Sequence, residues 1–162
     1  YYPTFYEGLE QSKNVFYTGQ EATQQIIAGL DWLVKEKKAK TFFLIGSDYI
    51  WPRTSNKIAR KHIENVIKGT VVGEEYYPLG HTQFGSLINK IKLKKPDAVY
   101  AIVVGGSNVS FYKQLKAAGV TADKQTLLTI SVTESPSWRR VNLVSAIFFF
   151  WLLSMMKFSR NR

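Results

Sequence analysis

The hydrophobic positions along the chain alternate between two periods. Strands are predicted at residues 41–45, 70–77, 98–104 and 127–132, with a shorter candidate at 15–18, and most of them are the near-continuous apolar runs that are typical of buried strands. Apolar residues at helical spacing occupy residues 21–37, 53–67, 83–94 and 107–118. Strands that alternate with helices of about a dozen residues form βαβ units, and strands apolar on both sides are typical of sheets covered on both faces. The sequence therefore predicts an α/β fold with a mainly parallel sheet and helices on both faces.

Prolines and glycines mark the expected ends of these elements. Pro52 opens the second helix, Pro78 ends the second long strand, and Pro96 makes a turn with Asp97. Gly119 follows the fourth helix, where a left-handed cap is expected.

Three loops are expected to share the ligand-binding edge of the sheet, because ligands of such folds bind at the carboxyl ends of the strands. They span residues 46–52, 105–107 and 131–134. The first loop carries Tyr49 and Trp51, two large aromatics where a turn needs neither. They form either a wall for a small neutral ligand or packing beneath Pro52. Asp48 is expected to act as a turn or helix-capping residue.

Composition excludes several kinds of site. The 162 residues are sufficient for one domain with a substantial core, at 45% hydrophobic and 21% charged content. There are no cysteines, which excludes disulfides and Cys-ligated metals, and two histidines make a His-rich metal site unexpected. No metal or cofactor is therefore implied. The Gly-Gly-Ser stretch at 105–107 precedes a helix and could bind an anion, but it lacks a nucleotide-loop frame.

The net charge of +10 is unevenly distributed. Residues 136–162 contain five basic residues and no acid. Basic residues of the body gather in KEKKAK at 35–40 and KIKLKK at 90–95, near helix ends where cations suit the helix dipole. No RNA-binding or zinc-finger motif accompanies the charge, so nucleic-acid binding is not expected.

The C-terminal segment departs from the alternating pattern. Residues 141–156 read VNLVSAIFFFWLLSMM, a nearly uninterrupted apolar run of 16 residues between Arg140 and Lys157. A membrane span needs about 20 residues. We interpret residues 135–162 as a tail foreign to the domain; a marginal membrane helix and a missing core element are the alternatives. If residues 141–156 form a marginal membrane helix, the chain would contact a membrane through them.

Four motifs carry a resemblance to a known family. They are YPTFYEGLEQSKNVFYTG at 2–19, GSDYIWPRTSN at 46–56, GEEYYPLGHTQF at 73–84 and KPDAVY at 95–100. In this order and spacing the chain resembles a type 1 periplasmic solute-binding protein, in the urea- and short-chain-amide-binding branch that serves ABC transporters. The resemblance runs from residue 1 to about 134.

The resemblance implies a partial chain of a two-lobed protein. Residues 1–38 resemble the end of the first lobe and the crossover, and residues 39–134 most of the second lobe, an incomplete α/β lobe. We expect the chain to begin within a domain, which would account for the lack of a signal peptide. A periplasmic or other extracytoplasmic location is implied.

The same resemblance implies the ligand site. Tyr2 and Thr4 would face the cleft from the first lobe, and Tyr49 and Trp51 from the second. Further second-lobe contacts would be backbone groups of Val104 and Gly105 and the hydroxyl of Ser131. Relatives often carry Tyr or Phe at the position of Trp51. Tryptophan keeps the aromatic wall there, but it offers an indole N–H donor where a tyrosine offers a hydroxyl. The implied ligand is urea or a short aliphatic amide, bound between lobes without chemistry.

Three function classes follow. The first is a solute-binding protein that presents an amide to an ABC transporter permease, with lobe closure as the mechanism. The second is an amide sensor of the same fold that is read by a regulator. The third, which we do not favour, is an α/β enzyme using His81 or Asp48. His81 lies on a strand-to-helix connection with no evident nucleophile or partner acid, and we expect it to be structural; His62, in a basic helix, is expected to be solvated.

Overall fold

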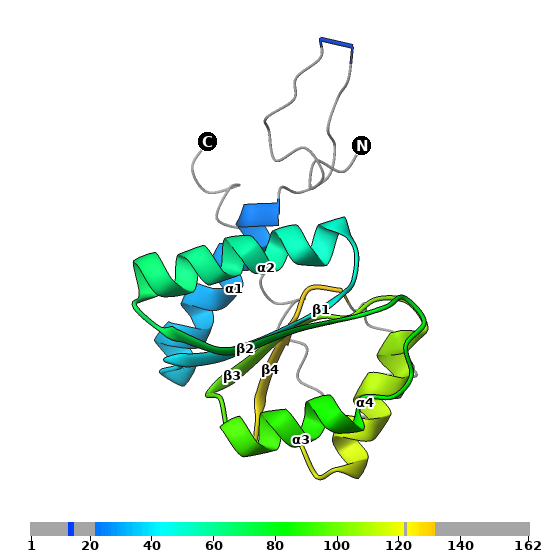
Figure 1. Cartoon of the computed structure of the whole chain (residues 1–162). Coiled ribbons are helices and arrows are strands. Elements are labelled where there is room, and N and C mark those ends of the chain that lie inside the picture. Colours follow the sequence, from blue (N-terminus) through cyan, green and yellow to red (C-terminus); the bar gives the residue numbers. More distant parts are fainter. Residues whose placement is uncertain (1–12, 15–21, 122, 132–162) are drawn as a thin grey trace, which may run out of the picture.

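The structure is a computed structural model of the whole chain, and it describes residues 13–14, 22–121 and 123–131. In this part of the chain four parallel strands form one sheet in the order β2-β1-β3-β4 (Figure 1). The strands are β1 (Thr41–Ser47), β2 (Thr70–Tyr77), β3 (Ala98–Ile102) and β4 (Thr126–Thr129). All four run in the same direction, so the parallel sheet predicted from the sequence is confirmed.

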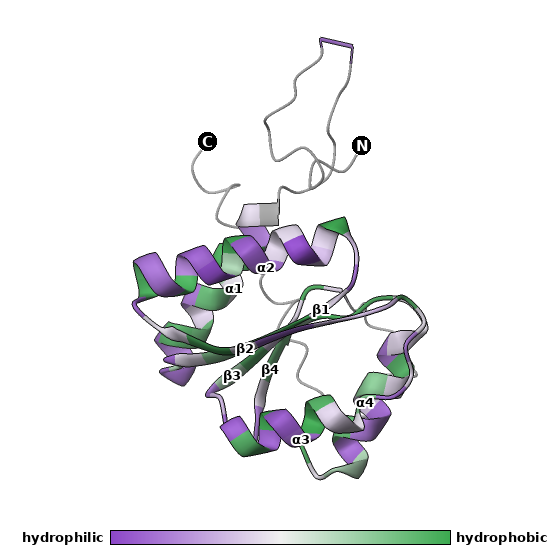
Figure 2. Cartoon of the chain, viewed as in Figure 1, coloured by the Kyte–Doolittle hydropathy of each residue, from purple (hydrophilic) through white to green (hydrophobic). Residues whose placement is uncertain are grey.

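Helices cover both faces of this sheet, as the apolar strands predict. Helices α1 (Ala22–Lys37) and α2 (Ile50–His62) lie on one face, and α3 (Gly85–Lys94) and α4 (Ser107–Ala117) on the other (Figure 1). Helix α2 continues into a short π-helical segment, η2 (Ile63–Ile67). The helix surfaces turned away from the sheet are largely hydrophilic (Figure 2).

Alternation along β1 divides the core into two layers. Phe42 and Leu44 pack with α1 and α2, whereas Phe43 and Ile45 pack with α3 and α4. All four side chains are buried because helices cover both faces of the sheet at β1. This buried strand ends at Ser47, and the first candidate loop follows it.

The predicted boundaries hold closely, with one instructive shift. Strand β2 spans the predicted residues, and Gly119 adopts the expected left-handed conformation, with φ of 72°. Helix α2 begins at Ile50, three residues before the predicted start, and Pro52 lies inside its first turn. Proline is tolerated there because the first N–H groups of a helix have no intrahelical acceptor.

Asp97 joins the starts of the two central strands. One oxygen of its carboxylate, Oδ2, accepts hydrogen bonds from the backbone N–H groups of Lys40 and Thr41, both at 2.8 Å, and from the Thr41 hydroxyl at 2.9 Å. These donors hold the pKa of Asp97 below its usual value, the backbone bonds contributing most. The KPDAVY motif thus includes the residue that fixes where β1 begins relative to β3.

Several predictions lie outside the described residues. These are the short strand at 15–18, the first-lobe residues Tyr2 and Thr4, and the apolar run at 141–156. Within the described residues no helix is long and apolar enough to cross a membrane.

Candidate functional site

The carboxyl ends of β1, β3 and β4 lie next to one another, because these strands are successive neighbours in the sheet. Each end leads into one of the three loops selected from the sequence, of which the third is described as far as Ser131. The strand order therefore gathers the loops at one edge, as expected for ligand sites of parallel sheets.

Tyr49 and Trp51 occupy the loop after β1 and the start of α2. Tyr49 is the N-cap residue in an extended conformation, and Trp51 lies in the first helical turn. Their ring centroids are 6.4 Å apart with an interplanar angle of 49°. Both are half-buried, and Trp51 packs in part against the core beneath α1 and α2. Burial raises the pKa of the Tyr49 hydroxyl, which remains protonated at neutral pH.

Asp48 pairs with Arg53 across the first turn of α2. The Arg53 Nε donates to Asp48 Oδ1 at 2.6 Å, and the guanidinium also lies 4.3 Å from the ring centroid of Tyr76. The hydrogen bond from Arg53 lowers the pKa of the Asp48 carboxyl. The N-cap position belongs to Tyr49 and shows no side-chain cap bond, so the helix-capping role considered for Asp48 is wrong. The carboxylate is instead paired with an arginine in the first turn of α2.

Val104 and Gly105 form the turn between β3 and α4. The backbone N–H of Val104 donates to the Ser47 hydroxyl oxygen at 3.1 Å, and the carbonyl of Gly105 accepts from the N–H of Asn108 at 3.2 Å. Gly105 has a φ of 61°, a left-handed conformation that glycine adopts without strain. Of the backbone groups expected to contact a ligand, the Val104 N–H is thus already engaged by Ser47.

Ser131 connects the ends of β3 and β4. Its hydroxyl donates to the carbonyl of Val103 at 2.7 Å and lies 3.3 Å from the hydroxyl of Thr129. A hydroxyl oxygen has two lone pairs, so this arrangement still permits Ser131 to accept a further hydrogen bond. The half-buried side chain belongs to the same edge as Tyr49 and the Gly105 turn.

The two histidines have local partners. The His81 ring lies 4.7 Å from that of Tyr77 and 5.0 Å from that of Phe84, and its Nε2 lies 2.8 Å from the carbonyl of Gln83. These contacts fit the structural role expected from the sequence. His62 Nε2 lies 2.6 Å from Asp31, so the expectation that it is merely solvated is wrong.

Sequence reasoning missed the residue that ties the first two loops together. Ser47 is 2% exposed and is the last residue of β1, where a small hydroxyl can reach the backbone of the neighbouring strand end. A serine directly after a buried apolar run was the available signal. No set of metal-ligating side chains gathers anywhere within residues 22–121 or 123–131.

Comparison with known proteins places the chain in a family. Residues 1–138 match the periplasmic binding protein domain family, and the chain belongs to it. The fold is that of a type 1 periplasmic binding protein lobe. The family expected from the four sequence motifs is therefore confirmed, whereas the urea and amide branch is not among the findings.

Solved structures agree with this assignment. An ABC transporter solute-binding protein from R. palustris in complex with benzoate has a TM-score of 0.63 and 27% identity, covering 72% of this chain and 31% of that one. A second solute-binding protein from R. palustris, in complex with 4-hydroxybenzoate, has a TM-score of 0.66 and 23% identity, and the match covers 75% of this chain and 33% of that one. An ABC transporter substrate-binding protein from Sphaerobacter thermophilus has a TM-score of 0.65 and 20% identity, and the match covers 78% of this chain and 34% of that one. The chain thus spans about a third of the length of these structures.

Proposed function

We propose that the protein to which this chain belongs captures a small neutral amide, urea or a short aliphatic amide, between two lobes and delivers it to an ABC transporter permease. The residues described here supply one wall of that site. Tyr49 and Trp51 provide the apolar surface, and the Gly105 turn and Ser131 provide hydrogen-bonding groups. No bond is made or broken in this function.

The observation that carries the proposal is the number of charged residues at the edge of the sheet where the strands have their carboxyl ends. Its connections and first helical turns span residues 48–53, 78–88, 103–110 and 130–131, and they contain two charged residues, Asp48 and Arg53. These two pair with each other at 2.6 Å. A carboxylate ligand is normally held by a free arginine or lysine, and this described wall offers none. A planar neutral molecule needs only hydrogen bonds and exclusion of water.

The neighbouring structures make this a selective prediction. Two of them hold benzoate or 4-hydroxybenzoate, which are aromatic acids. The pairing of Arg53 with Asp48 argues against binding of such an acid by this chain. If Arg53 turned to hold the carboxylate of the ligand, Asp48 would lose its own cation. Calorimetry on the full-length protein should show binding of urea or acetamide and weaker binding of 4-hydroxybenzoate, leucine and glutamate. Tighter binding of any of the three acids would refute the proposal.

Substitution of the aromatics tests the site itself. Tyr49→Ala or Trp51→Ala in the full-length protein should weaken amide binding by roughly 2 kcal/mol, as for a buried anchor residue. Trp32→Ala is the matched control, because Trp32 is a half-buried aromatic on α1 that packs against the same core cluster as Trp51. It should lower stability and leave affinity unchanged. Unchanged affinity in the Tyr49 and Trp51 variants would assign them to packing alone.

The 162-residue chain is expected to bind these ligands weakly by itself. A cleft gains affinity from contacts on both sides and from water exclusion on closure. Ordering residues from the opposite wall costs about 1–2 kcal/mol each, while a ligand of four heavy atoms returns at most roughly 1.5 kcal/mol per atom. Titrating residues 1–135 and 1–162 with urea and acetamide tests this. Micromolar binding by either would show that the described wall is a complete site.

A further inference from the structure

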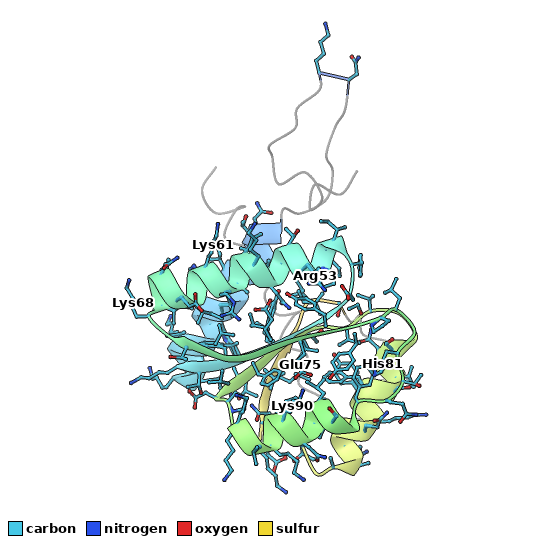
Figure 3. All side chains as sticks on the ribbon, viewed as in Figure 1. Arg53, Lys61, Lys68, Glu75, His81 and Lys90 are labelled. Atoms are coloured by element: carbon cyan, nitrogen blue, oxygen red, sulfur yellow. The ribbon has the colours of Figure 1, made fainter. Side chains whose placement is uncertain are left out.

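The lysines of the described chain concentrate at the end of the sheet opposite the candidate ligand site. We define the basic end as the last helical turns and the connections that lead into the four strands, residues 34–40, 64–69, 91–97, 114–121 and 123–125. In a parallel sheet all such connections lie at the amino ends of the strands. Figure 3 shows this separation, with Lys68 at one end of the domain and His81 at the other.

The basic residues of the basic end are ten exposed lysines, and none is an arginine: Lys35, Lys37, Lys38, Lys40, Lys68, Lys92, Lys94, Lys95, Lys116 and Lys124. Its described acids are Glu36, Glu64, Asp97 and Asp123. Two of these are engaged, Glu64 with Arg60 and Asp97 with the backbone at the start of β1. The carboxyl end, in contrast, carries a single compensated ion pair.

Helix dipoles do not account for this charge. Each helix C-terminus is equivalent to roughly half a negative charge, so the four helical C-termini at this end amount to about two. The lysines exceed the acids by six. Within the described residues the basic end therefore carries a net positive charge that attracts anions.

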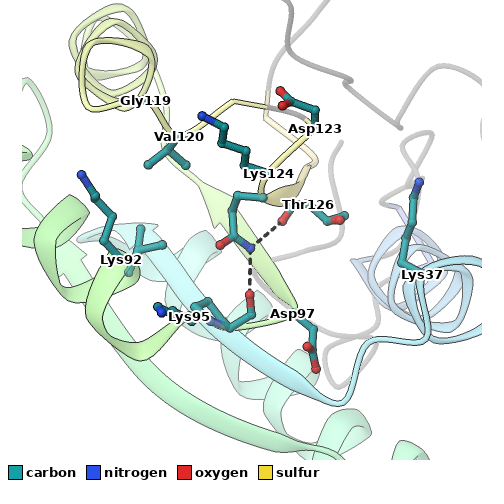
Figure 4. A pocket seen from close by; sticks show the side chains of 12 residues that line it. Lys37, Lys92, Lys95, Asp97, Gly119, Val120, Asp123, Lys124 and Thr126 are labelled. Carbon is teal, nitrogen blue, oxygen red and sulfur yellow. Dashed lines mark hydrogen bonds between the residues drawn. The ribbon is translucent and has the colours of Figure 1, made fainter.

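Four of the lysines surround a pocket at this end. The pocket has a volume of about 530 Å³ and lies between the C-terminal end of α3, the α4–β4 connection and the end of α1. Figure 4 shows Lys37, Lys92, Lys95 and Lys124 around its rim. Lys92 donates to the carbonyl of Ala118 at 3.2 Å, which holds α3 against the α4–β4 connection. The basic end is thus hollowed and not a smooth surface.

Exposed aliphatic side chains accompany the lysines. Leu93 is 85% exposed and Val66 is 66% exposed, the two largest values among the large apolar side chains of the described residues. Leu93 is flanked by Lys92 and Lys94, and both aliphatic residues lie in the last helical turns of the basic end. Aliphatic side chains among flexible lysines are typical of surfaces that adsorb to anionic bilayers.

We infer that the basic end is a docking surface for the anionic phospholipid headgroups of a membrane, into which Leu93 and Val66 insert. Lysine suits this occupant because its charge is compact and mobile, whereas directional recognition of an acidic protein favours arginine. In this orientation the candidate ligand site faces away from the bilayer (Figure 3), so this docked state is not the one that delivers a ligand to a permease. The inference does not depend on the identity of the ligand.

Vesicle sedimentation with the 162-residue chain tests this docking surface. Vesicles of phosphatidylcholine with about a third phosphatidylglycerol should bind the chain, and pure phosphatidylcholine should bind it far less. Lys94→Gln combined with Lys124→Gln should weaken binding roughly 25-fold, since each lysine near an anionic surface contributes about fivefold. The control removes the same charge from the outward face of α2, as Lys57→Gln with Lys61→Gln, and should change binding less than about threefold, because screening confines the effect to about 8–10 Å.

The aliphatic contact has its own matched pair. Leu93→Ser should weaken binding several-fold, and Leu79→Ser, which changes a 60% exposed leucine at the carboxyl end, should not. Thermal unfolding of each variant confirms that the fold is retained. The inference would be overturned if the two double lysine variants lost the same affinity for vesicles, or if uncharged vesicles bound the chain equally well. It would also be overturned if Leu93→Ser had no effect, a result that would indicate a surface for soluble polyanions.

Discussion

Gly73→Ala should destabilise the domain through one identifiable contact. An ideal Cβ at Gly73 would lie 2.4 Å from Cε2 of Phe43 and 2.8 Å from its Cδ2 and Cζ. Phe43 is 1% exposed and packed between the sheet and helices α3 and α4, so its ring has little room to move. Overpacking of this kind costs about 1–3 kcal/mol, and alanine recovers up to about 1 kcal/mol over glycine in a strand. We expect the free energy of unfolding to fall by roughly 1–2 kcal/mol.

Urea denaturation followed by circular dichroism measures this loss. With a slope of about 2 kcal/mol per molar urea, the midpoint should fall by roughly 0.5–1 M. Gly85→Ala is the control, because a Cβ there meets nothing within 4 Å and Gly85 lies at the start of α3. Alanine at that position should be neutral or stabilising by up to about 1 kcal/mol.

A second substitution assigns the loss to the ring. In the Phe43→Leu background, Gly73→Ala should cost less than it does in the unaltered chain, since the contacting ring atoms are absent. The difference between the two costs is the coupling energy of the pair. An equal cost in both backgrounds would show that the close approach of Gly73 to Phe43 is not the cause.

Three further predictions concern hydrogen bonds and backbone conformation. Asp97→Asn should make stability less dependent on pH: the lowered pKa of Asp97 gives the unaltered chain stability that is present above about pH 4 and is lost as pH falls through the lower folded value, so urea midpoints measured between pH 6 and about 3 should converge at the acid end. Ser47→Ala should cost about 1 kcal/mol in urea denaturation and speed hydrogen exchange at the Val104 amide, which loses its acceptor. Gly119→Ala should lower stability by about 1 kcal/mol, because φ is 72° there, and Gly119→Asn by less.

The core and the element order could be predicted because one kind of signal fixes both. An apolar run that is buried on two faces must be a central strand, and β1 and β3 are central strands in the structure. Helix α2 begins earlier than the predicted residue 53 because Pro52, expected to open the helix, lies at its third residue, and proline is tolerated throughout the first turn. The π-helical segment η2 gives no distinct pattern, because its apolar spacing remains close to that of an α-helix.

The candidate site was predictable in its location and less so in its interactions. Residues at strand ends are brought together by topology alone, which sequence periodicity reveals. Pairings such as Asp48 with Arg53, or Ser47 with the Val104 amide, depend on side-chain rotamers and on the register of neighbouring strands. Sequence spacing does not specify these, and the helix-capping role considered for Asp48 failed for that reason.

The hydroxyl bonds at the strand ends have a consequence for motion. Ser47 holds the loop after β3 to the end of β1, and Ser131 holds the end of β4 to β3. Three loops that are fastened in this way lose most of their independent torsional freedom before any solute arrives. Whatever docks at this edge therefore meets a surface whose ordering entropy was lost during folding, and the remaining adjustment is a displacement of the lobe as a unit.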